Sequence, residues 1–497
     1  MTEVNAAQDI GVQEDDEKTL KSMGYAQELA RRMSGFSNFA ISLSVICILA
    51  GCITSFQVGF CTVGGASIGL CWPLVCLFAL MVALTMGQVA SAFPTAGGLY
   101  HWASILGGKG WGWITAWFNL AGLITVLAAI NAGTYDFVVG AFEIPVGKHP
   151  DAIKRVVVTG ITLSQALLNH KGIRITSLLT DFSGYPILAV SVLLTGVLLW
   201  KSPGFHFSRL VTFTNYSGIP AGDPVFPKTG NMAWLFALGA LLPAYTVTGF
   251  DASAHTSEET MGAAKNVPRG IVRSVLVSGL FGWIMLAAIV LAIPDMDAAA
   301  AQGVGVFYWI MRNTVSSPVG LAFFVGIAIA QYVCGLATLT SASRMTYAFA
   351  RDRGLPFSDG LKRVSPTSRT PSIAIWTVAV IALLFTIFIP YTTIAAVCAV
   401  FLYISYVLPT GLGFFAYCRR WTTMGPWDIG RWYRPLTALS VIGCVFLLVI
   451  GMAPPNQQAV YIVGGAIVVL AVAWFGFVGK RFQGPPAAIM AKCGEAK

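Results

Sequence analysis

The stretch NMAWLFALGALLPAYTVTGFDASAHTSEET, residues 231–260, sets the architecture of this chain. Its first half is apolar enough to cross a bilayer, but it continues into Thr-Val-Thr-Gly, an aspartate, a histidine and two glutamates. Glycine and threonine weaken a helix, and a carboxylate inside a membrane span is rare and energetically unfavourable. The stretch therefore predicts a membrane helix that is interrupted midway, with Asp251 beside the interruption.

The composition is that of an all-α polytopic membrane protein. The 497 residues are 56% hydrophobic and 10% charged, whereas soluble proteins have about 25% charged residues. The apolar runs are long enough for helices and too long for barrel strands. About twelve transmembrane helices are predicted, at residues 36–60, 72–93, 112–138, 154–169, 178–200, 232–255, 271–293, 318–349, 373–389, 392–417, 436–453 and 459–478.

The basic residues are distributed unevenly between the two sides of these spans. The net charge is +10. If each span reverses the direction of the chain, most of the 31 lysines and arginines fall on the same side of the membrane as the N-terminus. The positive-inside rule therefore predicts a multi-pass protein of the cell membrane, plasma or inner, with both termini cytoplasmic. The basicity reflects topology, so no nucleic-acid partner is expected.

The spans group into two halves. Each half opens with an interrupted helix, at residues 36–60 and 232–255, and five spans per half would make the halves inverted relative to each other. The acidic run at residues 14–17 is expected to be disordered or frayed. The predicted domains are an N-terminal tail (1–35), a first five-helix repeat (36–200), an extracellular loop (201–231), a second repeat (232–418), helices 11 and 12 (419–478) and a C-terminal tail (479–497).

The two interrupted helices predict a substrate site near the middle of the membrane. Unwound backbone is unfavourable in lipid and is tolerated where it lines a polar cavity. Free N–H groups at half-helix N-termini suit a carboxylate, and free carbonyls at half-helix C-termini suit an ammonium group. The candidate substrate-binding residues are Gly51, Cys52, Ile53, Thr54, Ser55, Tyr245, Val247, Thr248, Gly249 and Phe250.

Acidic residues supply the candidates for gating and coupling. Asp251 could carry a proton, bind a substrate amine or hinge a gate; alternatively it is a neutralised acid bonded to unwound backbone. Glu258 and Glu259, with Lys265 and Arg269, predict a cytoplasmic ion-pair latch, or else a solvated loop. Two further acids, Asp136 and Asp181, lie near span ends, where solvation is expected.

Hydroxyl and aromatic side chains give weaker signals. Thr338, Thr340 and Ser341 in the eighth span could form a cation site, although interhelical hydrogen bonding explains them equally well. Tyr403 and Tyr406 are candidates for pocket lining or for plain packing. The chain has no phosphate-binding loop, no histidine pattern typical of a metal site and no nucleophile motif, so neither a cofactor nor an enzymatic activity is expected.

Four stretches together resemble the amino acid–polyamine–organocation (APC) superfamily of permeases. They are GFSNFAISLSVICILAG, SAFPTAGGLYHWAS with WITAWFNLAG, GFDASAHTSEET followed by NVPRGI, and SRMTYAFARDRGLPFS. The resemblance extends from about residue 24 to residue 480 and is greatest to the amino acid/choline branch, which includes GABA-permease-like proteins. It implies a 5+5 inverted repeat with broken helices 1 and 6, two extra C-terminal helices and alternating access.

The chain departs from the family pattern at informative positions. Ile53-Thr54-Ser55 stands where relatives carry a Gly-Ser-Gly-like run, and Asp251 replaces a longer acid. The fifth span lacks the lysine that substitutes for sodium in some relatives, so H⁺ and Na⁺ both stay open as coupling ions.

The sequence therefore predicts a secondary active transporter for amino acids or related small amines such as GABA. Its partners would be that small-molecule substrate, a coupling ion and the lipid bilayer. An uncoupled exchanger or facilitator is the main alternative, and an amino acid sensor without transport is a weaker one.

Overall fold

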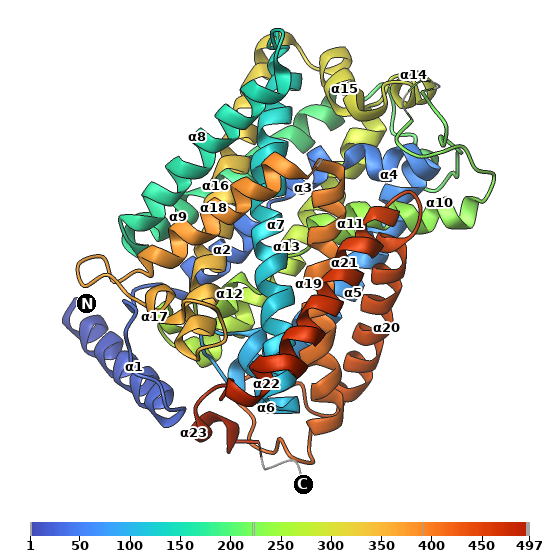
Figure 1. The fold of residues 1–497 in the computed structure, drawn as a ribbon. Helices are drawn as coiled ribbons and strands as arrows, with labels where there is room; N and C mark the ends of the chain where they lie inside the picture. Colours follow the sequence, from blue (N-terminus) through green and yellow to red (C-terminus); the bar gives the residue numbers. More distant parts are fainter. Residues whose placement is uncertain (1, 221, 223, 390, 494–497) are drawn as a thin grey trace.

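The computed structural model describes residues 2–220, 222, 224–389 and 391–493, and within them it contains helices and loops with no β-strand. Figure 1 shows long helices running side by side, with both ends of the described chain on the same face of the bundle. We call this the terminal face; it carries α1, α17 and α23, and α14 and α15 lie at the other end of the molecule.

The helices are α1 (Thr2–Ser22), α2 (Gly35–Ile46), α3 (Ile48–Thr54), α4 (Phe56–Val63), α5 (Trp72–Ala92), α6 (Leu99–Gly107), α7 (Lys109–Phe142), α8 (Pro150–His170), α9 (Ile173–Lys201), α10 (Met232–Gly239), α11 (Leu241–Thr246), α12 (Ala252–His255), α13 (Ala263–Ala292), α14 (Met296–Ala300), α15 (Val306–Thr314), α16 (Ser317–Arg351), α17 (Ser358–Leu361), α18 (Ser372–Phe388), α19 (Tyr391–Ala416), α20 (Tyr433–Met452), α21 (Gln457–Ala473), α22 (Gly479–Arg481) and α23 (Ala487–Met490).

Each predicted span corresponds to a helical segment. Nine helices in the described residues are long and apolar enough to cross a membrane. Two shorter apolar segments, Met232–Thr246 and Ser372–Phe388, and the more polar α8 account for the other predicted spans. The all-α, multi-pass fold class is therefore confirmed, while the inverted relation between the two halves stays a prediction.

The first span is interrupted at two points, of which the sequence predicted only the second, near Ser55. Cys47 adopts a left-handed conformation (φ 32°, ψ 83°) and separates α2 from α3, and a smaller irregularity follows at Ser55. Gly51, one of the candidate substrate-binding residues, lies within α3. Its role is close packing, because a Cβ there would lie 2.8 Å from the Cα of Thr246 in the other interrupted span.

The second span is broken where the sequence predicted. Helix α11 ends at Thr246, α12 begins at Ala252, and Gly249 between them has a φ of 81°. A Cβ at Gly249 would overlap the side chain of Val45 in α2. Only glycine satisfies both the positive φ and this close approach.

The two breaks lie against each other at the centre of the bundle. Ser42 of α2 donates a hydrogen bond of 2.8 Å to the Phe250 carbonyl, and its hydroxyl lies 2.7 Å from that of Ser253. Helix α7 packs against α16 and α19 around this centre. Unwound backbone is thereby enclosed by protein and kept away from lipid, as a membrane span requires.

The acidic run at residues 14–17 is helical, and the expectation of a disordered tail is wrong. It belongs to α1, and the Asp16 carboxylate accepts hydrogen bonds from the backbone N–H groups of Gly262 (2.7 Å) and Ala263 (3.3 Å). These are unpaired N–H groups at the start of α13, where a negative charge is favourable. Tertiary contact, and not local propensity, fixes this segment.

We expect Gly249→Ala to lower the stability of the protein. Holding a non-glycine residue at positive φ costs about 1–2 kcal/mol, and the added methyl group would also have to displace Val45. The midpoint of thermal unfolding in detergent should fall for this variant and hardly change for Gly464→Ala, because nothing lies within 4 Å of a Cβ at Gly464 in α21. Equal shifts for both variants would contradict the assignment of strain to Gly249.

Candidate substrate and coupling site

Asp251 lies at the end of the second break and is fully buried. Its Oδ1 accepts a hydrogen bond of 2.8 Å from the Tyr406 hydroxyl of α19. Its Oδ2 accepts one of 2.8 Å from Asn119 Nδ2 of α7 and lies 3.2 Å from His255 Nε2, one turn further along the chain. Three side chains from three elements therefore surround one carboxyl group in the interior of the bundle.

Tyr406 connects this carboxyl group to the unwound backbone. Its hydroxyl oxygen accepts a hydrogen bond of 2.9 Å from the Gly249 N–H while its proton is donated to Asp251. The tyrosine thus satisfies an N–H that would otherwise be unpaired in a low-dielectric interior. The sequence left open a carboxylate bonded directly to the unwound backbone; in the structure Tyr406 stands between the two.

A cavity of about 290 Å³ is lined in part by α4 and the loop before α10, which lie toward the end of the bundle opposite the terminal face (Figure 1). Its walls come from α3, α4, α11, α19 and α20 and from the loop before α10. Of the predicted substrate-binding residues, it is lined by Thr54, Ser55 and Tyr245. Tyr403, the second aromatic candidate, also lines it and donates a hydrogen bond of 3.3 Å to the Ala244 carbonyl.

The other predicted substrate-binding residues lie between the helices and outside the cavity lining. Cys52, Val247 and Phe250 are fully buried, and Ile53 and Thr248 nearly so. The remaining two, Gly51 and Gly249, mark the closest approaches of the two interrupted spans. The structure therefore brings the predicted residues together but places only three of them at the cavity.

Two buried ion pairs close the terminal face. The Arg351 guanidinium contacts the Glu258 carboxylate at 2.8 and 2.9 Å, and that of Arg344 contacts Glu259 at 3.0 and 3.1 Å. Both glutamates lie in a 3₁₀ turn, η3 (Ser257–Glu259), and both arginines lie in α16. The pairs therefore fasten the end of the second interrupted span to the long helix beside it.

These partners differ from the predicted ones. The sequence joined Glu258 and Glu259 to Lys265 and Arg269, but both of these basic residues are exposed on α13. The chain turns at Gly262 before α13 begins, which directs their side chains to solvent while the glutamates point inward. Both glutamates form ion pairs, but their partners come from α16, and a role of these pairs as a gate latch stays a prediction.

Glu258 is ionised in this arrangement. Burial alone would raise the pKa of its carboxyl group, but the Arg351 guanidinium and the Ala96 N–H, at 3.1 Å, bring the pKa below its usual value. A buried carboxylate is favourable only with such partners.

The N-terminal segment braces the same turn. Arg31 donates hydrogen bonds to the carbonyls of Thr260 (2.6 Å) and Ser257 (3.2 Å), and Gln27 donates one of 2.8 Å to the Glu258 carbonyl. The ring of Tyr25 lies 3.8 Å from the Arg351 guanidinium, within cation–π distance. Chain that was expected to be a tail thus forms part of the closed face.

The hydroxyls proposed for a cation site bond mainly within α16. Thr338 and Ser341 donate to the carbonyls four residues earlier, at 2.9 and 3.2 Å. Thr340 lies 2.7 Å from Asn169 Oδ1 of α8. In the described residues these contacts are those of helix-to-helix hydrogen bonding, and the cation site stays a prediction.

The acids near span ends lie apart from the breaks. Asp136 forms a half-exposed ion pair with Lys154 of α8, with N···O distances of 2.7 and 2.8 Å. The side chain of Asp181 lies outside the described residues. Asp136 is therefore not an acid of the cavity.

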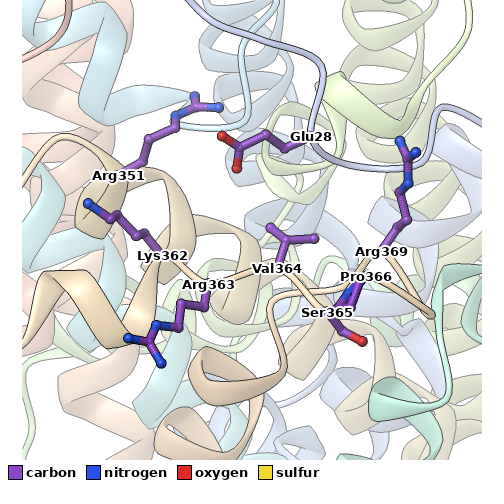
Figure 2. A pocket seen from close by; sticks show the side chains of 8 residues that line it. All are labelled: Glu28, Arg351, Lys362, Arg363, Val364, Ser365, Pro366 and Arg369. Atoms are coloured by element: carbon purple, nitrogen blue, oxygen red, sulfur yellow. The ribbon is translucent and has the colours of Figure 1, made fainter.

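A second hollow, of about 560 Å³, lies on the terminal face (Figure 2). Figure 2 shows the Glu28 carboxylate turned toward Arg351, and Tyr347 bridges these two side chains through hydrogen bonds of 2.8 and 3.4 Å. The lining residues are Glu28, Arg351, Lys362, Arg363, Val364, Ser365, Pro366 and Arg369. Its excess of positive charge is what the positive-inside rule predicts for a loop at a membrane surface.

Sequence reasoning missed two residues of the Asp251 cluster, Asn119 and His255, and gave Tyr406 no specific role. Asn119 lies in the first half of α7, a 34-residue helix that is otherwise largely apolar. The rule that drew attention to Asp251, a polar group within a membrane span, would have found it. His255 lies one helical turn after Asp251, a spacing that places both side chains on one face.

Two interrupted spans, a cavity on one side of them and buried ion pairs on the other define a class of protein: a multi-pass membrane carrier. Comparison with known proteins gives the same class. The sequence model of the amino acid permease family matches residues 33–477. The chain therefore belongs to the amino acid permease family.

Individual relatives match over nearly their full length. The chain is 31% identical to amino-acid permease BAT1 of Arabidopsis thaliana over 471 residues, 90% of each chain. It is 31% identical to the homolog of that protein in Oryza sativa over 505 residues, 94% of each chain. It is 27% identical to the GABA-specific permease of Saccharomyces cerevisiae over 508 residues, 95% of this chain and 86% of that one. These relatives are permeases, so this chain is a transporter and not an enzyme.

We expect Arg351→Met to destabilise the protein strongly. Leaving Glu258 buried without its partner should cost about 3–5 kcal/mol. Lys154→Met is the matched control, because it breaks the half-exposed pair with Asp136 and should cost no more than about 1 kcal/mol. Thermal unfolding in detergent measures both.

The effect of Arg351→Met should depend on pH in a defined direction. In the wild type the lowered pKa of Glu258 gives stability that is present above the unfolded value of about 4.3 and lost as the pH falls through the folded value. In the variant, burial without Arg351 raises that pKa, so the stability deficit should shrink between pH 8 and pH 5. A deficit that is constant over this range would contradict the ion-pair account.

Proposed function

We propose that this permease moves amino acids or related small amines such as GABA across the cell membrane by alternating access. The observation that carries the proposal is the junction of the two interrupted spans. It has a cavity on one side, a sealed face on the other and the buried Asp251 cluster between them. Families that share this plan bind substrate at such breaks. The names of the relatives support amino acids and GABA as substrates.

The substrate site is proposed where the cavity meets the two breaks. Thr54, Ser55 and Tyr245 would contact the substrate first, and the other predicted residues would be reached as the interrupted spans move apart. None of the described lining residues is charged. This favours a neutral amino acid or GABA, whose two charges suit the partial charges of helix ends.

The sealed face is proposed to be the cytoplasmic one. It carries both termini, and the basic hollow there fits a cytoplasmic surface. In this arrangement the cavity faces outward, and the pairs of Glu258 and Glu259 with α16 would separate when the protein opens inward.

Transport is proposed to be coupled to an ion through Asp251. An uncoupled exchanger is the second candidate, and it is favoured by the fact that both carboxyl oxygens already have partners in the closed protein. Coupling to sodium would instead use the hydroxyl oxygens of Thr338, Thr340 and Ser341. In this structure these hydroxyl groups donate hydrogen bonds to neighbouring oxygens.

The direct test is uptake of labelled amino acids, GABA and choline into proteoliposomes, with proton and sodium gradients imposed in turn. We expect one class of substrate to accumulate with one gradient. Uptake only against preloaded internal substrate would establish the exchanger. No uptake by protein shown to be folded would contradict the transport proposal.

We expect Asp251→Asn to separate exchange from coupling. The amide cannot ionise, yet it can keep the hydrogen bond from Tyr406 on one atom and donate from the other. Asn119 can turn to accept from it, because Asn119 Oδ1 has no hydrogen-bond partner in the described structure. The variant should retain exchange of labelled substrate and lose gradient-driven accumulation. Asp136→Asn, outside the site, should retain both, and wild-type accumulation by Asp251→Asn would rule out its coupling role.

A further inference from the structure

His255 is held at both ring nitrogens, and its partners reveal where its protons lie. Its Nδ1 lies 3.2 Å from the carbonyl oxygen of Ala96, in the segment between α5 and α6. A carbonyl oxygen can only accept a hydrogen bond, so Nδ1 carries a proton. His255 is fully buried, so bulk solvent does not reach its ring in the closed protein.

The other ring nitrogen faces a second acceptor. Nε2 lies 3.2 Å from Asp251 Oδ2. A hydrogen bond there needs one further proton, either on Nε2, beside a carboxylate, or on Oδ2, beside a neutral imidazole. Both states have zero net charge and contain the same number of protons. Without that proton, a bare nitrogen lone pair would face a buried carboxylate, which is strongly unfavourable in this interior.

We propose that His255 and Asp251 together are the proton-binding site of this permease, and that the peptide of Ala96 links release of the proton to opening of the terminal face. The inference rests on the proposed transport function and adds the identity of the ion, the atoms that hold it and the route by which the gate senses it.

Ala96 is the physical link between the proton site and the gate. Its carbonyl accepts from His255 Nδ1 at 3.2 Å, and its N–H donates to Glu258 Oε1 at 3.1 Å. Glu258 is the carboxylate that pairs with Arg351 across the sealed face. Inward opening is proposed to move η3 relative to both α16 and the segment between α5 and α6, a motion that breaks both bonds of Ala96.

The glycines that follow Ala96 allow this contact. Gly98 has a φ of 48°, and a Cβ there would lie 3.2 Å from His255 Cε1. The turn contains Pro94 and the pair Gly97–Gly98. In the structure the turn brings a main-chain carbonyl against the imidazole, which a bulkier residue would hold off.

The groups around the His255–Asp251 pair contribute no net charge. Tyr406 from α19 and Asn119 from α7 contribute neutral hydrogen-bond donors to Asp251. The charges that lie toward α16 cancel in the pairs of Glu258 with Arg351 and Glu259 with Arg344. A proton added to or removed from the pair therefore changes the net charge of the whole buried cluster by one unit.

The cycle moves one proton without covalent chemistry. From the outer side, water protonates the pair at Nε2 or Oδ2 and removes the buried negative charge, which permits closure around substrate. On inward opening, η3 leaves Ala96, His255 loses its Nδ1 partner, and the proton passes to cytoplasmic water. Because His255 and Asp251 are fully buried here, the described state is the one in which the proton is enclosed.

The test compares His255→Gln with wild type in proteoliposomes, using radiolabelled GABA as the probe and a pH-sensitive dye in the lumen. Glutamine can still donate to the Ala96 carbonyl but cannot titrate. With an inward gradient of one pH unit and one proton per substrate, wild type should accumulate GABA about tenfold. His255→Gln should reach no accumulation and show no GABA-dependent acidification, because the buried Asp251 charge then opposes closure. Asp251→Asn, which is always neutral, should also lose accumulation and acidification but keep GABA counterflow, which needs no gradient.

His101→Gln is the matched control. His101 is also fully buried and also pairs with an acid, Asp352, at 3.0 Å, but its other nitrogen contacts Thr95. It should keep the accumulation ratio and the acidification. Should His255→Gln fail to fold, the same two measurements on Asp251→Asn test the proton site through its other residue.

The outcomes separate the inference from the proposed function. Accumulation and acidification by His255→Gln at wild-type levels would overturn the proton site. Counterflow by wild type without any response to a pH gradient would also overturn it and leave an exchanger. Absence of both counterflow and uptake in folded wild type, with GABA and with the amino acid panel, would overturn the transport function and this inference with it.

Discussion

The structure depends on a single constraint, which is that unwound backbone inside a membrane must find its hydrogen bonds within the protein. The chain meets it with side chains brought from distant segments. Tyr406 accepts from the Gly249 N–H, and Ser42 donates to the Phe250 carbonyl. The Cys334 thiol contacts the Val45 carbonyl beside the first break at 3.3 Å. The helices that supply these groups are thereby fixed around the breaks.

Much of the architecture could be predicted from sequence, because lipid imposes simple rules on it. Span number and helical class follow from apolar run length, and the break at Gly249 follows from glycine beside threonines and an acid. The break at Cys47 could not be predicted, since cysteine has no preference for a left-handed conformation. Its position is set by packing, with Gly51 kept helical so that the two spans can touch.

The candidate site was predicted less completely, because its contacts join residues that are remote in sequence. Arg344 and Arg351 lie 85 and 93 residues from the glutamates that they pair with. The nearer Lys265 and Arg269 were a reasonable expectation from proximity alone. Helix α1 illustrates the same limit, since Asp16 is ordered by the start of α13, 246 residues away. Local pattern identifies which residues are unusual, whereas tertiary contact decides their partners.

The ion pairs on the terminal face also bear on how readily that face can open. An apolar seam exposes hydrocarbon to water when it separates, and the free energy rises with the exposed area. A seam of buried ion pairs behaves differently, because each ion regains hydration as it loses its partner. Arg31 and Gln27 hold carbonyls of the turn itself, so the N-terminal segment can travel with it. In the proposed transport cycle, the sealed state would thus differ from the open state mainly in the solvation of these ions.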